Sequence, residues 1–218
     1  MDREQEQRLL EALQQAVISG DEEKTEQLAK KAIKEGIDLL LALEEGLGKG
    51  MMILGDAFSA GETFLPELIT AADALKAGTD ILAPELKSRG IQRKSAGVVV
   101  LGTAPGDIHD IGKTLVSIFL TVHGFEVYDL GVDVSPEKFV EAVRQYKADI
   151  VGISSLLTTS MVVQPYVLAA LKQANLRPQV KVMVGGGPVT AGWAEQIGAE
   201  AYGMDATEAV EKSEALML

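Results

Sequence analysis

Residues 97–113, GVVVLGTAPGDIHDIGK, run from an apolar segment through a polar loop towards an apolar helix. The run 97–101 is typical of a buried strand, and open α/β sheets bind ligands at the carboxyl ends of their strands. His109 stands two residues after Asp107, so one ring nitrogen could bind a metal while the other donates its N–H to the carboxylate. Gly112 would let a large group approach the backbone. The stretch therefore predicts an α/β sheet with a ligand site after its first strand.

The remainder of the chain extends this α/β pattern. Counting this first run, at 98–102, short apolar runs lie also at 126–130, 150–154 and 180–184, with a weaker one at 199–203, and helical stretches separate them. Strands that alternate with helices indicate a parallel sheet. The runs are apolar on both faces, as expected when helices cover both sides. We expect a Rossmann-like, doubly wound, five-stranded parallel sheet.

The part before this sheet is helical by its three-and-four apolar spacing. Helices are expected at 8–18, 22–35, 37–58 and 65–82, with Asp21 and Asp38 as N-caps, which together predict a four-helix bundle. From Pro84 to residue 95 the sequence turns polar and basic around Gly90, as in an exposed linker. The expected parts are a helical cap domain at 1–88, a linker at 89–96 and the sheet domain at 97–218.

Composition limits the classes of function. The 218 residues carry a net charge of −12, which disfavours nucleic acid and anionic membranes as partners. There is no cysteine, so thiolate sites are excluded, and the two histidines are the nitrogen side chains suited to a transition metal. No signal peptide or membrane span is recognisable, and a cytoplasmic protein is expected.

Loops after the other strands carry small and hydroxylated residues. The third strand leads into the segment 154–160, SSLLTTS; the fourth leads into GGGP at 185–188, and the fifth into GMDA at 203–206. These loops should converge on the edge that holds His109. They predict a slot beside a metal ligand, polar on one wall and lined by bare backbone on the other, suited to a planar heteroaromatic group on a nucleotide-like tail.

The D-x-H-x-x-G pattern of Asp107, His109 and Gly112 resembles the corrinoid-binding motif of methionine synthase and of the corrinoid proteins in methanol, methylamine and methoxyaryl methyltransferase systems. The resemblance implies a bound cobalamin or related corrinoid, with His109 as the cobalt ligand and Asp107 and Ser160 as its hydrogen-bond relay. Residues implied to contact the cofactor are Gly106, Asp107, Ile108, His109, Asp110, Gly112, Ser154, Leu156, Thr158, Gly185, Gly186 and Ala206.

The helical part also resembles the cap domain of that family, through GDAF at 55–58 and GETFLP at 61–66. By this resemblance, Phe58 and Leu65 would lie over the upper face of the corrinoid and shield a methyl group on cobalt (methylcobalamin). His123 precedes Gly124 at a helix end, and we interpret it as structural, since a histidine there can interact with terminal carbonyls.

The resemblance implies a methyl-carrying subunit that is not a complete enzyme. Cobalt would cycle between Co(I) and methyl-Co(III), taking a methyl group by way of a substrate-specific methyltransferase. A second methyltransferase would pass it to tetrahydrofolate or a thiol coenzyme, and a reductive activase would be a further partner. The cofactor supplies the chemistry, and the protein sets ligation and shielding.

Three alternatives stay open. A cobalamin-dependent sensor would need a DNA-binding segment and a tryptophan in the cap, whereas the single tryptophan, Trp193, lies in the sheet domain. The small subunit of an adenosylcobalamin mutase shares the motif but normally lacks such a cap. A corrinoid-free nucleotide- or flavin-binding protein would leave the Asp107 and His109 pair unexplained.

Overall fold

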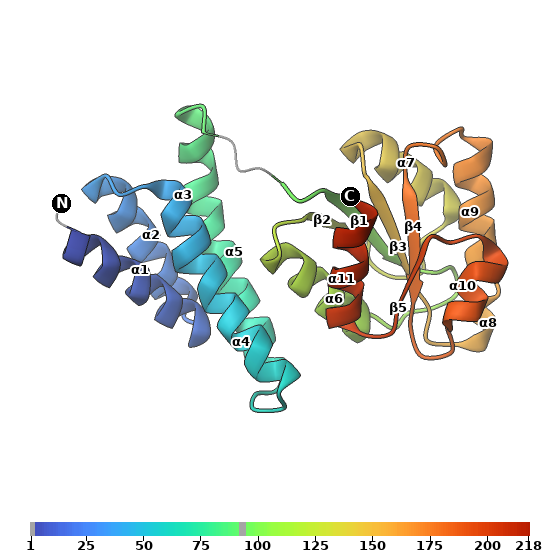
Figure 1. Ribbon diagram of the computed structural model, residues 1–218, viewed down its shortest axis with the longest axis horizontal. Helices are drawn as coiled ribbons and strands as arrows, with labels where there is room; N and C mark the ends of the chain where they lie inside the picture. Colours follow the sequence, from blue (N-terminus) through green and yellow to red (C-terminus); the bar gives the residue numbers. More distant parts are fainter. Residues whose placement is uncertain (1–2, 92–94) are drawn as a thin grey trace. The chain divides into compact units, whose positions relative to one another are not determined.

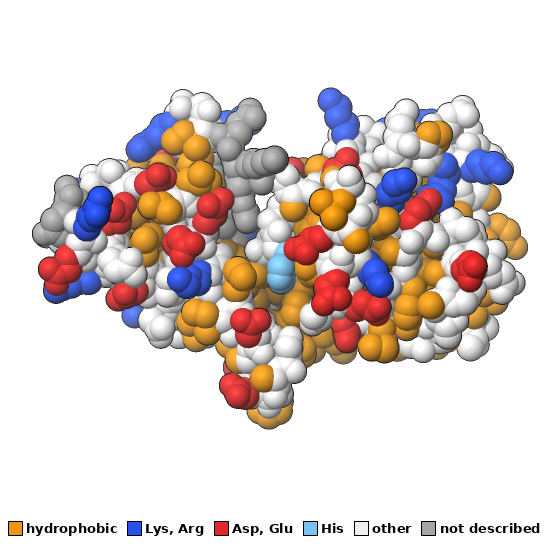
Figure 2. Space-filling model, in the orientation of Figure 1, with side chains coloured by type: hydrophobic (Ala, Val, Ile, Leu, Met, Phe, Trp, Pro, Cys, Tyr) orange, Lys and Arg blue, Asp and Glu red, His pale blue; other side chains and the backbone are white. Residues whose placement is uncertain are grey.

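The computed structural model describes residues 3–91 and 95–218. The chain divides into two compact units, with the boundary between residues 94 and 95. The first unit is helical and the second is α/β (Figure 1). Residues 92–94, in the middle of the expected linker, lie outside the described residues. Acidic side chains are spread over the visible face of both units, with basic ones among them, as the net charge of −12 requires (Figure 2).

The helical unit follows the predicted order of helices. It consists of α1 (Arg3–Ile18), α2 (Glu22–Glu35), α3 (Leu39–Leu41), the π-helix η1 (Ala42–Gly48), α4 (Lys49–Ser59) and α5 (Leu65–Ser88). Both predicted N-caps are confirmed: the Asp21 carboxylate accepts the Lys24 N–H at 2.9 Å, and that of Asp38 accepts the Leu40 N–H at 2.9 Å. Fully buried leucines such as Leu13, Leu47 and Leu68 fill the centre of this unit.

The helix expected at 37–58 is not uniformly α-helical, because its middle winds as η1. This segment packs closely on α1: a Cβ at Gly50 would come within 2.7 Å of the Gln14 carbonyl oxygen. The Gln14 side-chain amide donates to the Glu45 carbonyl at 2.6 Å. A π-turn leaves carbonyls misaligned with the α-helical ladder, and here a neighbouring side chain satisfies one of them.

The expectation that the chain becomes a linker at Pro84 is wrong. Helix α5 continues through Pro84 to Ser88, although proline removes one helical hydrogen bond. Leu82 and Leu86 are both buried, so continuing the helix keeps apolar surface out of water. Beyond Ser88 the chain turns away at Gly90, whose φ of +70° is left-handed and whose N–H donates to the Lys87 carbonyl at 3.1 Å.

The α/β unit contains the predicted five-stranded sheet, and all its strand pairs are parallel. The strands are β1 (Val98–Thr103), β2 (Glu126–Asp129), β3 (Ile150–Ser154), β4 (Lys181–Gly185) and β5 (Ala201–Gly203), in the order β2-β1-β3-β4-β5. The doubly wound fold class is thereby confirmed. In this order β1 and β3 flank the point where the winding reverses, which is where such sheets bind ligands.

Helices cover both faces of the sheet (Figure 1). One face packs on α7 (Pro136–Tyr146), α9 (Gln164–Gln173) and α10 (Ala191–Ile197), and its core includes Val151, Val182 and Phe139. The other face lies under α6 (Ile111–Val122) and α11 (Ala206–Leu216), which contact each other. The short α8 (Thr158–Met161) follows the loop after β3. Among the described helices, none is long and apolar enough to cross a membrane.

Candidate functional site

Asp107 is the centre of the hydrogen-bond network at the reversal point between β1 and β3. Its side chain is fully buried, and its Oδ2 accepts the Leu156 N–H at 2.8 Å, the Leu157 N–H at 3.3 Å and the Ser160 hydroxyl at 2.5 Å. Its Oδ1 accepts the backbone N–H of His109 at 3.1 Å. One carboxylate therefore joins the loop after β1 to the loop after β3.

These contacts keep Asp107 ionised. Burial raises the pKa of this carboxyl, but hydrogen bonds from Ser160, from the His109 ring and from the Leu156 and His109 N–H groups outweigh burial and hold the pKa well below its usual range. The carboxylate is therefore an acceptor at neutral pH. Hydrogen bonds to a charged acceptor are stronger than neutral ones, so the two loops are firmly joined.

His109 turns one ring nitrogen to this carboxylate, with Nδ1 lying 2.7 Å from Asp107 Oδ1. A carboxylate only accepts, so Nδ1 carries the proton and the lone pair is on Nε2. The side chain is 47% exposed, in contrast to the fully buried Asp107. The arrangement matches a metal-binding histidine oriented by a carboxylate.

Two residues that the sequence analysis missed hold the loop around His109. Asp133, in the loop after β2, has a left-handed φ of +50° and accepts the Gly106 N–H at 2.7 Å through its carboxylate. The Thr103 hydroxyl donates to the His109 carbonyl at 2.9 Å. Asp133 lies just after the strand expected at 126–130. Its place after a strand is the sequence signal that could have assigned it to the same edge of the sheet as His109.

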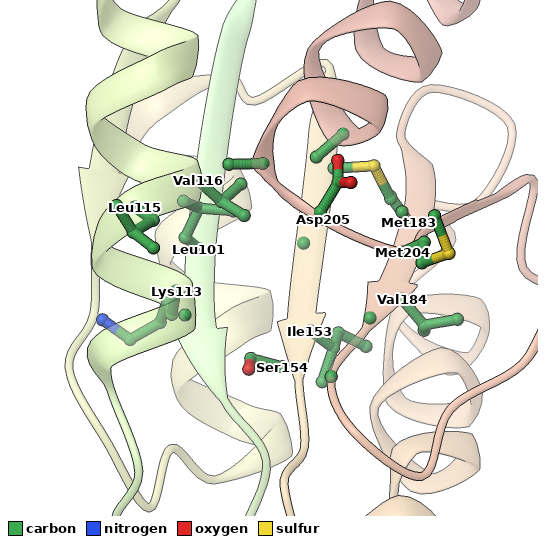
Figure 3. Close-up of a pocket in the computed structure, with 17 residues that line it drawn as sticks. Leu101, Lys113, Leu115, Val116, Ile153, Ser154, Met183, Val184, Met204 and Asp205 are labelled. Carbon is green, nitrogen blue, oxygen red and sulfur yellow. The ribbon is translucent and has the colours of Figure 1, made fainter. Parts of the chain in front are cut away.

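A cavity of about 280 Å³ lies beside this loop, between the sheet, α6 and α11 (Figure 3). Five of the predicted contact residues line it: Gly112, Ser154, Gly185, Gly186 and Ala206. The structure thus brings together residues from four loops that are far apart in the sequence. Most other lining side chains are apolar, among them Leu101, Val116 and Met183.

The lining glycines serve two different purposes. A Cβ at Gly186 would come within 2.0 Å of the Ser155 carbonyl oxygen, and one at Gly185 within 2.8 Å of the Gly203 carbonyl oxygen, so the fold itself needs both. A Cβ at Gly112 would meet no other atom within 4 Å. Packing within the protein does not explain this glycine, whereas a ligand in the cavity would.

The other predicted contact residues lie outside the cavity wall. Leu156 is half exposed, and Ile108 is 76% exposed beside His109. Thr158 begins α8, and Asp110 occupies the N-cap position of α6 without a side-chain capping bond. Phe58 and Leu65 belong to the helical unit. Phe58 lies near the end of α4 and Leu65 begins α5, and both are partly buried. Phe64, which precedes Leu65, is 69% exposed.

Sequence reasoning also missed a buried polar network under the loop after β3. Gln164 is fully buried, and its amide nitrogen donates to the Ser155 hydroxyl at 3.1 Å. Its amide oxygen accepts the Trp193 indole N–H at 2.9 Å. Lys113, also buried, pairs with Asp129 at the end of β2. A glutamine and a lysine at helix starts give no sequence signal of burial.

Comparison with known proteins identifies the family. The B12 binding domain family matches residues 97–216, and a second B12 binding domain family matches residues 9–83. The chain belongs to the B12-binding corrinoid proteins. It is 45% identical over 204 residues to a corrinoid protein of Desulfitobacterium hafniense (strain Y51), covering 93% of this chain and 94% of that protein. It is 46% identical over 200 residues to trimethylamine corrinoid protein 2 of Methanosarcina acetivorans, covering 92% of each.

Solved structures agree with this assignment. The methanol:cobalamin methyltransferase complex MtaBC from Methanosarcina barkeri contains a chain that this corrinoid protein matches with a TM-score of 0.86 and 29% identity, covering 96% of this chain and 80% of that one. The monomethylamine corrinoid protein of the same organism matches at 37% identity with a TM-score of 0.54, covering 96% and 99%. The resemblance to corrinoid proteins of methyltransferase systems is confirmed, and so is the corrinoid cofactor.

Proposed function

We propose that this corrinoid protein carries a methyl group between two methyltransferases and that His109 is the protein ligand of cobalt. The observation that carries the proposal is the His109 ring, fixed by Asp107 at 2.7 Å, in the segment between β1 and α6 whose Gly112, three residues further on, lines the cavity. A bound corrinoid supplies a cobalt centre that accepts and releases methyl groups. The protein itself positions that centre.

The residues of the chain divide this task. Asp107, itself held by Ser160, fixes the tautomer and the orientation of the His109 ring. Because Asp107 stays ionised, it accepts the Nδ1 proton of His109 and leaves the Nε2 lone pair for a metal. The cavity beneath α6 and α11 would hold the nucleotide tail, with Gly112 open towards it and Ser154 at its polar side.

Phe58 and Leu65 would shield the upper face of the corrinoid. Phe58 lies near the end of α4 and Leu65 at the start of α5, so both flank the short loop that connects these two helices. We propose tetrahydrofolate or a thiol coenzyme as the final acceptor and a reductive activase as a further partner. The names of the trimethylamine and dimethylamine corrinoid proteins among the relatives favour a methylamine as the donor.

A methylation assay tests this function. The chain is loaded with hydroxocobalamin, reduced chemically, and mixed with trimethylamine with and without a trimethylamine methyltransferase. We expect the absorption of methylcobalamin to appear only when the methyltransferase is present, because activation of the amine is the task proposed for that partner. Methylation at the same rate without the methyltransferase would contradict a carrier that depends on partner enzymes.

A further inference from the structure

The floor of the tail cavity is set by the register of three strands. Leu101, Gly152 and Met183 are directly paired across β1, β3 and β4. Side chains alternate along a strand, and the neighbours Val100, Val151 and Val182 belong to the core on the opposite face. Leu101 and Met183 therefore point to the cavity face on either side of a residue without a side chain.

Leu101 leans over this glycine, since a Cβ at Gly152 would come within 2.3 Å of Leu101 Cδ2. Met183 closes the floor on the other side, and it is only 4% exposed (Figure 3). The next paired row towards the mouth is Ser154, Gly185 and Gly203, which adds one hydroxymethyl group. The cavity is thus open at its mouth and closed by two hydrocarbon or thioether side chains at its floor.

Three of the described lining side chains are polar, and two of them already make a hydrogen bond or an ion pair within the protein. The Asp205 carboxylate caps α11 by accepting the Glu208 N–H at 2.8 Å, and the Lys113 ammonium is paired with Asp129. Ser154, on the row nearer the mouth, is the third. The two side chains of the floor row, Leu101 and Met183, themselves offer no hydrogen bond to a group that reaches them.

We propose that Met183 is a specificity-determining residue that selects corrinoids whose lower base is a benzimidazole over those whose lower base is a purine. The proposal rests on the seat for the nucleotide tail proposed above. The six-membered ring of a benzimidazole is hydrocarbon and can be buried here without losing hydrogen bonds. Adenine would bury an amino group and two ring nitrogens, and an unpaired polar group is costly to bury.

The test measures the affinity of the full chain for three corrinoids by quenching of the fluorescence of Trp193, its single tryptophan. The probes are cobalamin with dimethylbenzimidazole, the cobamide with adenine, and tail-less cobinamide. We expect cobalamin to bind about tenfold more tightly than the adenine form, which corresponds to one unpaired buried polar group. This comparison needs no variant.

Met183→Gln places an amide of similar length at the floor, and Met183→Leu is the matched apolar control. The glutamine variant should lose most of the preference for cobalamin over the adenine form, while the leucine variant should keep it and cobinamide affinity should be the same in all three proteins. Equal affinity of the parent for the two complete cobamides overturns the inference, and so does an unchanged ratio in Met183→Gln. Cobinamide binding as tight as cobalamin binding would instead overturn the proposed tail seat.

Discussion

At the residue scale, the site depends on one buried carboxylate, that of Asp107, which accepts hydrogen bonds from two loops. Asp107 accepts the Ser160 hydroxyl at 2.5 Å, and both side chains are buried. Ser213 offers a matched comparison, because its buried hydroxyl donates at 2.7 Å to a neutral acceptor, the Ala209 carbonyl. The Ser160 hydroxyl also lies 2.9 Å from the Leu157 carbonyl and accepts the Leu157 N–H at 3.3 Å, so the two serines differ in the charge of an acceptor and in these added contacts.

We expect Ser160→Ala to lower the free energy of unfolding by about 1.5–3 kcal/mol and Ser213→Ala by about 0.5–1.5 kcal/mol, because hydrogen bonds to charged groups contribute more. Urea unfolding of both variants at neutral pH, where Asp107 is ionised, measures the difference. If Ser160→Ala cost no more than Ser213→Ala, the contact with Asp107 would have no special strength.

At the element scale, two helices whose second residue is a glycine with open space around it separate ligand binding from folding. Gly112 stands at the second residue of α6 and Gly192 at the second residue of α10, and a Cβ at either would meet no atom within 4 Å. Only Gly112 lines the cavity.

Gly112→Leu and Gly192→Leu should therefore have similar, small effects on thermal unfolding, since both replace glycine by a good helix former. Gly112→Leu should weaken cobalamin binding by about tenfold or more, because the new side chain occupies space at the cavity, and Gly192→Leu should leave it unchanged. Titration followed by fluorescence quenching measures this. Equal affinities for the two variants would show that α6 does not border the bound cofactor.

The elements also show what the sequence could predict. Alternating apolar runs and helix caps predict the order of strands and helices, because these signals are local, as the capping bonds of Asp21 and Asp38 confirm. The π-helix and the continuation of α5 through Pro84 depend on packing against distant residues, such as the approach of Gly50 to Gln14 and the burial of Leu86. The D-x-H-x-x-G motif predicts the loop at Asp107, but Asp133, Gln164 and Met183 join the site only through the fold.

At the scale of the whole molecule, the helical unit is proposed to shield the cofactor that the α/β unit binds. Phe58 and Leu65 are proposed to confine a methyl radical released by light, which favours its return to cobalt. Replacing both by alanine should speed the net photolysis of bound methylcobalamin while the affinity for it stays close to that of the parent. The rate of the absorption change under steady illumination measures this.

Leu41→Ala is the control, because Leu41 is an exposed leucine of α3, at the other end of the helical stretch that runs from α3 to α4. It should leave photolysis unchanged. Circular dichroism establishes that the bundle is intact in both variants. A double variant that is folded and photolyses at the parental rate would show that Phe58 and Leu65 only stabilise the helical unit.

The central claim, that His109 binds cobalt, is tested most directly by electron paramagnetic resonance of the protein loaded with cobalamin and reduced to the Co(II) state. The protein is produced with histidine labelled with ¹⁵N in the ring. Because the chain has two histidines, His109→Ala and His123→Ala separate them, and His123 is bound to the Phe119 carbonyl at 2.8 Å. We predict that the labelling changes the nitrogen splitting of the cobalt signal, that the change persists in His123→Ala, and that it is lost in His109→Ala. A splitting that is the same with and without the label would contradict the assignment of His109 as the cobalt ligand, and so would an effect of the label that persists in His109→Ala.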